Sequence, residues 1–245
     1  MQTPVCIFGL LPSQYLPPFA AILADGSVVT WGSQSHGGDS SAVQDQLRNV
    51  LQVQSTRMAF AAILADGSVV TWGGRRHGAD SSAVQDQLRN VQQVQSTRMA
   101  FAAILENGSV VTWGTETSGG DSSAVQDQLK NVQKVHATWH AFAAILADGS
   151  VVTWGDEACG GDSSQVQDQL RNVQQVASTG RSFAAILADG HVMTWGDVWN
   201  GGDSSAVQDQ LRNVQQVRAT GNAFAAILFL SLILSIGQIR KSRHL

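Results

Sequence analysis

The sequence predicts an all-β fold with short connecting helices, an array of β-propeller-like blades, from three observations. The first is an internal repeat of 41 residues, visible in the spacing of the Trp-Gly pairs that begin at Trp31 and Trp72. The second is an Asp-Gly pair between two apolar runs in each of several copies. The third is a globular composition, 43% hydrophobic and 14% charged. A period of about 20–50 residues is typical of solenoids and propellers, whose units bury apolar faces against their neighbours.

The second copy shows the elements of one unit. We expect strands at residues 60–64 and 69–72, joined by a tight turn at Asp66-Gly67, because Asp-Gly between apolar runs is a hairpin signal. Both faces of these strands are apolar, which is typical of strands covered on both sides. An antiparallel hairpin suits a propeller blade, whereas a parallel β-helix needs crossover turns.

A short helix is expected after this hairpin. Ser82 and Gln85 have the spacing of a capping box. Val84, Leu88 and Val91 follow on one helical face, which predicts about two turns of helix. A further strand then begins at Val94 and leads into the next copy.

The copies predict five to six blades. We count five strands before the repeated Phe, six that contain it and five that end in Trp-Gly. A five-bladed ring results if the strand at 214–217 joins the first hairpin at 19–31 and displaces the last strand. Six blades with imperfect closure and an open arc are the alternatives. The expected organisation is a lead-in at 1–18, a repeat domain at 19–228 and a tail at 229–245.

Charge and cysteine content narrow the function classes. A formal net charge of −4 argues against a nucleic-acid-binding protein, which normally carries a concentrated basic surface. Cys6 and Cys159 occupy unrelated repeat positions, which argues against a disulfide framework and a cysteine metal site. They fit a reducing compartment, and we expect a cytoplasmic location. The start has no basic leader before an apolar run, unlike a secretory signal.

The C-terminal end leaves the repeat after Leu228. Its apolar run at 223–237 is 15 residues long, shorter than the roughly 18–20 of a membrane-spanning helix. The basic residues Arg240, Lys241 and Arg243 would suit a cytoplasmic flank. One interpretation is a tail anchor, which makes the membrane a candidate partner. The interpretation we favour is a hydrophobic chain end that packs on the last unit.

The unit FAAILADGSVVTWG, followed downstream by a Gly-Gly pair, resembles the repeat of the regulator of chromosome condensation family over about residues 19–228. The short period is similar to the compact blades of β-lactamase inhibitor protein II in the same superfamily. The resemblance implies a propeller, seven-bladed in both of those members, and mostly protein binding. Members include an exchange factor for Ran, a β-lactamase inhibitor and propellers of HECT ubiquitin ligases. This chain has fewer copies and no HECT-like segment, and no functional residue is carried over.

Differences between the copies separate scaffold from candidate surface. One variable stretch follows each Trp-Gly pair, and a second precedes the repeated Phe. The first stretch occupies 33–36, 74–77, 115–118, 156–159 and 197–200, and the second 57–58, 98–99, 139–140, 180–181 and 221–222. Strand direction places both stretches on one face and the Asp-Gly turns on the opposite face.

The variable face is the candidate partner-binding site. Trp and Arg are over-represented at interface hot spots, and loops on a rigid scaffold commonly carry binding. The candidate contacts are Arg57, Arg75, Arg76, His77, Arg98, Trp139, His140, Arg181 and Trp199. Early copies contribute basic residues and later copies acidic ones, which suits an as yet unidentified protein better than a polyanion. The alternative is neutral drift of exposed loops after duplication.

No motif indicates catalysis, a cofactor, a metal or a small-molecule substrate. The repeated Asp-Ser-Ser triplet at Asp39 and its equivalents is best explained as a cap for orphan backbone N–H groups. His36 and His77 share a repeat position that other copies fill with Ser, Cys or Asn, and His136 and His140 fall across a predicted strand and loop, which argues against zinc. The Gly-Gly pairs lack the Lys of a phosphate loop.

The sequence therefore predicts a non-catalytic protein-interaction module with variable loops on one propeller face. The alternatives are a regulatory propeller of the guanine-nucleotide-exchange or ubiquitin-ligase-associated type, and a fragment of a longer repeat protein without independent activity.

Overall fold

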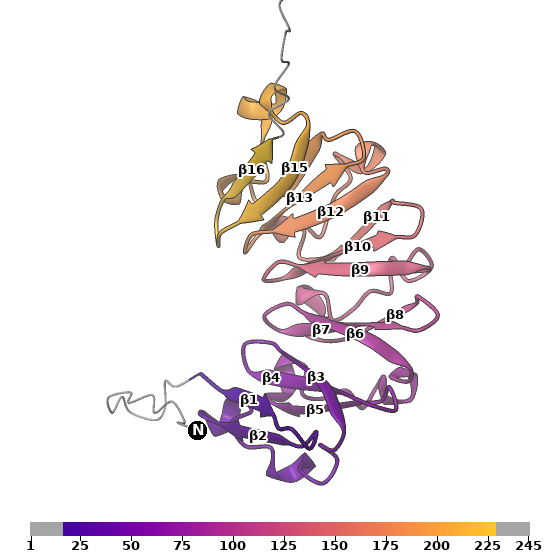
Figure 1. The fold of residues 1–245 in the computed structure, drawn as a ribbon, viewed down its shortest axis with the longest axis vertical. Helices are drawn as coiled ribbons and strands as arrows, with labels where there is room; N and C mark the ends of the chain where they lie inside the picture. Colours follow the sequence, from indigo (N-terminus) through magenta and orange to yellow (C-terminus); the bar gives the residue numbers. More distant parts are fainter. Residues whose placement is uncertain (1–16, 229–245) are drawn as a thin grey trace, which may run out of the picture.

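The computed structural model describes residues 17–228, and these residues form six small antiparallel sheets stacked along an open arc (Figure 1). Four sheets are complete three-stranded blades, and the first and last have two strands each. The complete blades are β3 (Val50–Ser55), β4 (Ala59–Leu64), β5 (Val69–Gly73); β6 (Val91–Ser96), β7 (Ala100–Leu105), β8 (Val110–Gly114); β9 (Val132–Ala137), β10 (Ala141–Leu146), β11 (Val151–Gly155); and β12 (Val173–Ser178), β13 (Ser182–Leu187), β14 (Val192–Gly196). The end blades are β1 (Phe19–Ile22) with β2 (Val28–Trp31), and β15 (Val214–Ala219) with β16 (Phe224–Leu228).

The predicted strands are confirmed, and each complete blade follows the order first, second and third strand in sequence and in space. The Asp-Gly turn is also as expected. In the second unit the Leu64 N–H donates to the Ser68 carbonyl at 2.9 Å, and the Asp66 carboxylate accepts from the Ser68 N–H at 2.9 Å. Gly67 sits between them with a φ of 77°, a left-handed conformation that favours glycine.

The expected short connecting helices are present, but they are 3-10 helices, and the single helical face expected from Val84 to Val91 is wrong. The structure has only short 3-10 turns in these connections, and Val91 is the first residue of β6. The 3-10 turns are η1 (Gln34–His36), η2 (Ser41–Val43), η3 (Arg75–His77), η4 (Gln85–Gln87), η5 (Glu116–Ser118), η6 (Glu157–Cys159), η7 (Gln167–Gln169), η8 (Val198–Asn200) and η9 (Ser205–Gln210).

The side chains of the supposed capping box explain the difference. Ser81 rather than Ser82 donates to the Gln85 side chain, at 2.7 Å. The amide of Gln85 donates in turn to the Val69 carbonyl on the outer edge of β5, at 2.9 Å. Gln85 therefore satisfies a strand edge 16 residues away instead of a helix end. The Asp of the triplet does cap a turn, since Asp80 accepts the Ser82 N–H at 3.2 Å.

The core lies between successive blades. Each blade has a face toward the preceding blade, formed by its Phe and Trp, and a face toward the following blade, formed by alanines and Ile. Between the second and third blades, Ala61 and Ile63 of β4 pack against Phe101, Ala103 and Trp113. Small alanines let the aromatic residues of the next blade approach closely. This burial of apolar surface is the main stabilising contribution.

A hydrogen bond joins each interior blade to the unit before it. The Trp72 indole N–H donates to the Gly37 carbonyl at 3.0 Å, and the same bond recurs from Trp113 to Gly78 at 2.9 Å. Trp154 and Trp195 repeat it with the equivalent glycines at 3.1 Å. We call this contact the Trp–Gly bond. It uses the N–H of a buried indole, which otherwise would lack an acceptor.

The arc does not close within residues 17–228. Figure 1 shows β1–β2 and β15–β16 at opposite ends of the arc. Of the arrangements left open by the repeat, the structure has the open one. The expected lead-in, apart from its last residues, and the expected tail lie outside the described residues. No helix within 17–228 is long and apolar enough to cross a membrane.

Candidate functional site

The two variable stretches of one unit lie side by side. In the second unit the Gly74 N–H donates to the Met58 carbonyl at 2.7 Å. The Thr56 hydroxyl donates to the His77 carbonyl at 3.0 Å. Equivalent threonines make the same bond in the next three units. We call the surface formed by all ten stretches the variable face.

Backbone hydrogen bonds also join the variable face from blade to blade. The Arg57 N–H donates to the Arg98 carbonyl at 3.0 Å, and the Arg98 N–H donates to the Trp139 carbonyl at 2.9 Å. The series continues from Trp139 to Gly180 and from Gly180 to Gly221, each at 2.8 Å. The peptide groups are therefore fixed across five units, while the side chains at these positions differ.

The opposite face varies less, since four of its five turns carry Asp-Gly and the third carries Asn107-Gly108. Its Asp-Gly turns pack against the asparagines that precede each first strand, and the Val91 N–H donates to the Gly67 carbonyl at 2.9 Å. Asn90 has a φ of 54°, in the left-handed region that asparagine tolerates better than most residues. The turn and the asparagine together leave little freedom for variation, unlike the loops of the variable face.

Arg98 and Trp139 form one packed group on the variable face. The guanidinium carbon of Arg98 lies 3.5 Å from the centre of the Trp139 ring, which is a cation–π contact. The other neighbour of this indole is Gly180, where an added Cβ would lie 2.5 Å from a ring atom. Trp139 is therefore half-buried and supported on two sides, so its replacement would change packing as well as surface.

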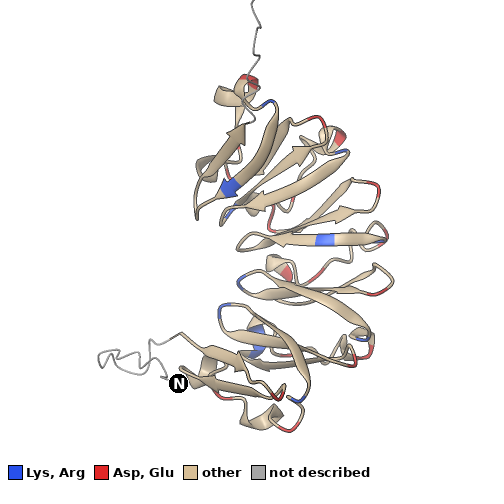
Figure 2. Cartoon of the chain, viewed as in Figure 1, with Lys and Arg blue, Asp and Glu red and all other residues tan. Residues whose placement is uncertain are grey.

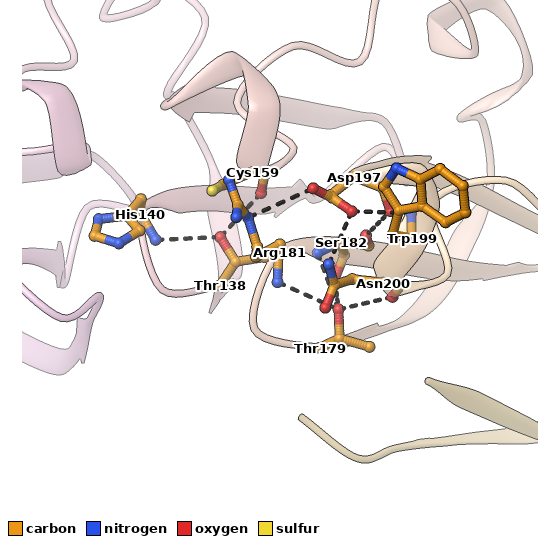
Figure 3. Close-up of polar contacts among 9 residues, drawn as sticks. All are labelled: Thr138, His140, Cys159, Thr179, Arg181, Ser182, Asp197, Trp199 and Asn200. Carbon is orange, nitrogen blue, oxygen red and sulfur yellow. Dashed lines mark hydrogen bonds and ion pairs between the residues drawn. The ribbon is translucent and has the colours of Figure 1, made fainter. Parts of the chain in front are cut away.

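Arg181, Asp197 and Trp199 form a second group (Figure 3). The Arg181 side chain lies beside Cys159, and its Nε is 3.6 Å from the Asp197 carboxylate. Asp197 accepts from the Asn200 side chain at 2.8 Å and from the Trp199 N–H at 2.9 Å. The pKa of Asp197 is lowered, mainly by the hydrogen bond from the Asn200 side chain. The Trp199 indole is 89% exposed, and it is the clearest candidate contact on the face.

The remaining arginines of the variable face are all exposed, and they differ in whether they form an ion pair. Arg75 binds Asp80 at 2.6 Å, and its hydrogen bond lowers the pKa of that carboxyl to about 2. Arg57 and Arg76 are exposed, and neither takes part in an ion pair within residues 17–228.

The histidines do not converge. His77 is half-buried, and burial lowers its pKa, with His36 and Arg57 adding to the effect. His140 lies 3.0 Å from the Ser118 hydroxyl through Nδ1, and burial also lowers its pKa. His136 belongs to β9, the strand that leads into the variable stretch at 139–140. No cluster of three or more potential metal ligands occurs in the described part of the chain.

We expect His136 to make the stability of the fold pH-dependent. Its Nε2 is buried with no hydrogen-bond partner within the described residues, and burial lowers its pKa from 6.5. The unfolded chain then binds the proton first as the pH falls below about 6.5, so the folded state loses stability from there toward the folded pKa. His136→Gln, which installs the residue of Gln54 and Gln95 at this position, should reduce the loss in urea midpoint between pH 7 and pH 5. An unchanged loss would contradict the assignment.

Several residues that shape the site are absent from the predicted set. Asp197, Ser118 and Gly180 position candidate side chains, and Gly180 makes room for Trp139. The sequence does carry one signal for the contact of Gly180 with Trp139. Trp139 is the only Trp in the second variable stretches, and the equivalent position in the next copy is a glycine. Contacts between neighbouring copies at the same repeat position could have been expected from the stacking alone.

Comparisons with solved structures identify the fold. Human WBSCR16 matches 86% of this chain over 71% of its own, with 19% identity and a TM-score of 0.57. Prp20p from Saccharomyces cerevisiae matches 88% of this chain over 68% of its own, with 17% identity and a TM-score of 0.52. The receptor kinase CR4 ectodomain from Physcomitrella patens matches 89% over 58% of its length, with 18% identity and a TM-score of 0.53.

These likenesses are limited to architecture, and the chain spans about two thirds or less of two of these structures. No family model matches the sequence, and neither does a curated protein. A second structure of this yeast protein, bound to Kap60, names it RCC1 (Prp20). The repeat of this chain resembles that of the RCC1 family. The chain thus has the RCC1-like β-propeller fold, with its blades in an open arc.

Proposed function

We propose that the chain is a non-catalytic module that binds a protein through the variable face. The observation that carries the proposal is the series of backbone hydrogen bonds that joins variable loops of five units into one surface. Such a surface offers a rigid main chain with side chains that differ from blade to blade. Rigid presentation lowers the entropy cost of association. The Prp20p structure was described together with binding to Gsp1p and histones, which is in keeping with a protein partner.

The charge of the face favours a partner of mixed charge. Arg57 and Arg76 are exposed in the second unit, and Glu116 and Glu157 are exposed in the third and fourth. Figure 2 shows basic and acidic residues distributed along the loops of the arc. Complementary charge of this kind sets orientation and association rate more than affinity. Trp199, near the acidic end, supplies the apolar contact that an interface centre needs.

The test is affinity capture with the full-length chain and one triple variant. The triple variant carries Arg57→Ala, Arg76→Ala and Trp199→Ala. Each of these side chains is exposed, and none forms an ion pair within the described residues, so the melting temperature should stay within a few degrees. Trp139 and Arg181 are left intact because both are packed or paired. A partner captured by the unmodified chain should be lost by the triple variant.

The matched control changes three arginines near the opposite face. Arg48, Arg89 and Arg171 are each about three-quarters exposed, and each precedes an asparagine that packs on an Asp-Gly turn. Their replacement by Ala should leave capture unchanged. Capture that survives the triple variant, or is lost equally in the control, would place binding elsewhere. No capture at all from several lysates would favour drift of the loops.

A further inference from the structure

The two ends of the arc expose faces that every complete blade buries. Phe19 and Trp31 of the first blade are 48% and 51% exposed, whereas the same positions in the complete blades are at most 5% exposed. Ile227 of the last blade is 50% exposed, and its equivalents in the complete blades are 4–5% exposed. In the interior, what covers such a face is always another unit of nearly the same sequence.

One donor and one acceptor of the Trp–Gly bond are also unpaired within residues 17–228. Gly201 stands at the repeat position of Gly37 and Gly160, and Phe224 packs on it as the other phenylalanines pack on theirs. Its carbonyl receives no indole N–H within residues 17–228, because the last blade has no third strand there. Trp31 carries the indole, and it has no glycine carbonyl to bind in the same range.

The missing strands are complementary. The first blade has a second and a third strand, and the last blade has a first and a second. β1 and β16 both begin with the sequence FAAI. β15 pairs with β16 in the register Arg218 to Ala225 and Val217 to Ala226. The same register is available to β1, with Ala20 and Ala21 in place of those alanines.

We propose that copies of this chain associate head to tail through a composite blade. In this blade the β1–β2 hairpin of one copy replaces β16 of another copy beside β15. The result is a complete three-stranded blade of ordinary sequence. Phe19 and Trp31 are buried against the fifth blade of the other copy, and the Trp31 indole donates to the Gly201 carbonyl. The hairpin keeps its contacts with its own second blade, since Ala20 and Val28 pack there on the opposite face.

The exchange favours the hairpin over β16. β16 is a single strand in which Phe224 is partly buried and the other four residues are exposed. Little burial is therefore lost when it leaves, because Phe19 of the incoming hairpin takes the place of Phe224. The hairpin brings two strands, a stacked Phe–Trp pair at 5.4 Å and the missing donor. The joint reproduces the interior blade-to-blade interface, and this continuity is the reason to assign the face to a second copy.

The first experiment measures the mass of the full-length chain by sedimentation velocity over a range of concentrations. We expect at least twice 26.0 kDa at high concentration, falling toward the monomer on dilution. Trp31→Asp should weaken association at least tenfold, because it removes the donor and places a charge in the joint. Arg89→Asp, which places the same charge at an exposed position between the second and third blades, should have no effect. A monomer at every concentration would overturn the proposal, and so would association that Trp31→Asp leaves unchanged.

A cross-link tests the strand exchange itself. In the interior the register pairs Gln54 with Ala61, so the composite blade places Arg218 of one copy opposite Ala20 of the other. Chains with Ala20→Cys and chains with Arg218→Cys, both in a Cys6→Ser background, should form a mixed disulfide when combined under mild oxidation. Arg76→Cys in place of Ala20→Cys should give none. A chain that carries both Ala20→Cys and Arg218→Cys tests whether one chain closes on itself. A disulfide that forms only within this chain, and not between the singly substituted chains, would overturn the proposal.

Discussion

Phe142→Ala is expected to destabilise the fold by about 3–5 kcal/mol, the range for a large aromatic side chain removed from a packed core. Phe142 is fully buried, stacks on Trp154 with ring centres 5.2 Å apart and covers Gly119. Its loss opens a cavity between the third and fourth blades that the neighbouring side chains of these blades cannot fill. The measurement is the urea midpoint, followed by circular dichroism at low protein concentration.

The repeat supplies a matched control for this change. Phe19 has the same local sequence and the same stacking partner, at 5.4 Å from Trp31, but its side chain is half-exposed. Phe19→Ala should therefore cost about 1 kcal/mol or less under dilute conditions. Equal effects at the two positions would mean that sequence, rather than the neighbouring blade, decides the contribution. A low concentration matters because association of copies would bury Phe19.

Gly119→Ala should destabilise the fold by about 2–4 kcal/mol, from two additive causes. Gly119 has a φ of 88°, which a residue with a Cβ rarely adopts. An added Cβ would also lie 2.5 Å from the Phe142 ring, which has no room to move away. The carbonyl of the same glycine accepts the Trp154 indole N–H at 3.1 Å, so a shift of this loop also weakens the Trp–Gly bond.

Gly221→Ala is the control for the glycine. Gly221 is exposed, its φ is not in the left-handed region, and no atom lies within 4 Å of an added Cβ. Its replacement should change stability by no more than about 0.5 kcal/mol. The two variants should be compared by chemical denaturation with a common slope. A small effect of Gly119→Ala would show that the loop relaxes freely and that the close packing of Phe on Gly is dispensable.

The strands and turns were predictable because their signals are local. Asp66-Gly67 between apolar runs dictates a hairpin whatever surrounds it, and the spacing of the Trp residues dictates the stacking. The helix expected around Ser82 to Leu88 does not form as predicted, because residues of this segment contact parts of the chain that are distant in sequence. Gln85 reaches the edge of β5, and Leu88 is buried between two blades. Propensity within a window of about ten residues does not include such partners.

The candidate site shows the same division. Strand direction alone placed both variable stretches on one face, since the two loops lie at the same end of antiparallel neighbours. The sequence did not distinguish the exposed Trp199 from Trp139, which lies between Arg98 and Gly180. Exposure depends on the side chain that the next blade presents, and that is a contact between residues 41 positions apart.

The sequence by itself determined the unit, its strand order and the face on which the copies differ, because these follow from nearest neighbours along the chain. The tertiary structure decided which arginines are paired, which aromatic side chains are buried and that the arc stays open. These depend on how one blade meets the next, and a blade whose outer neighbour is missing exposes Trp31 even though its sequence matches that of a buried copy.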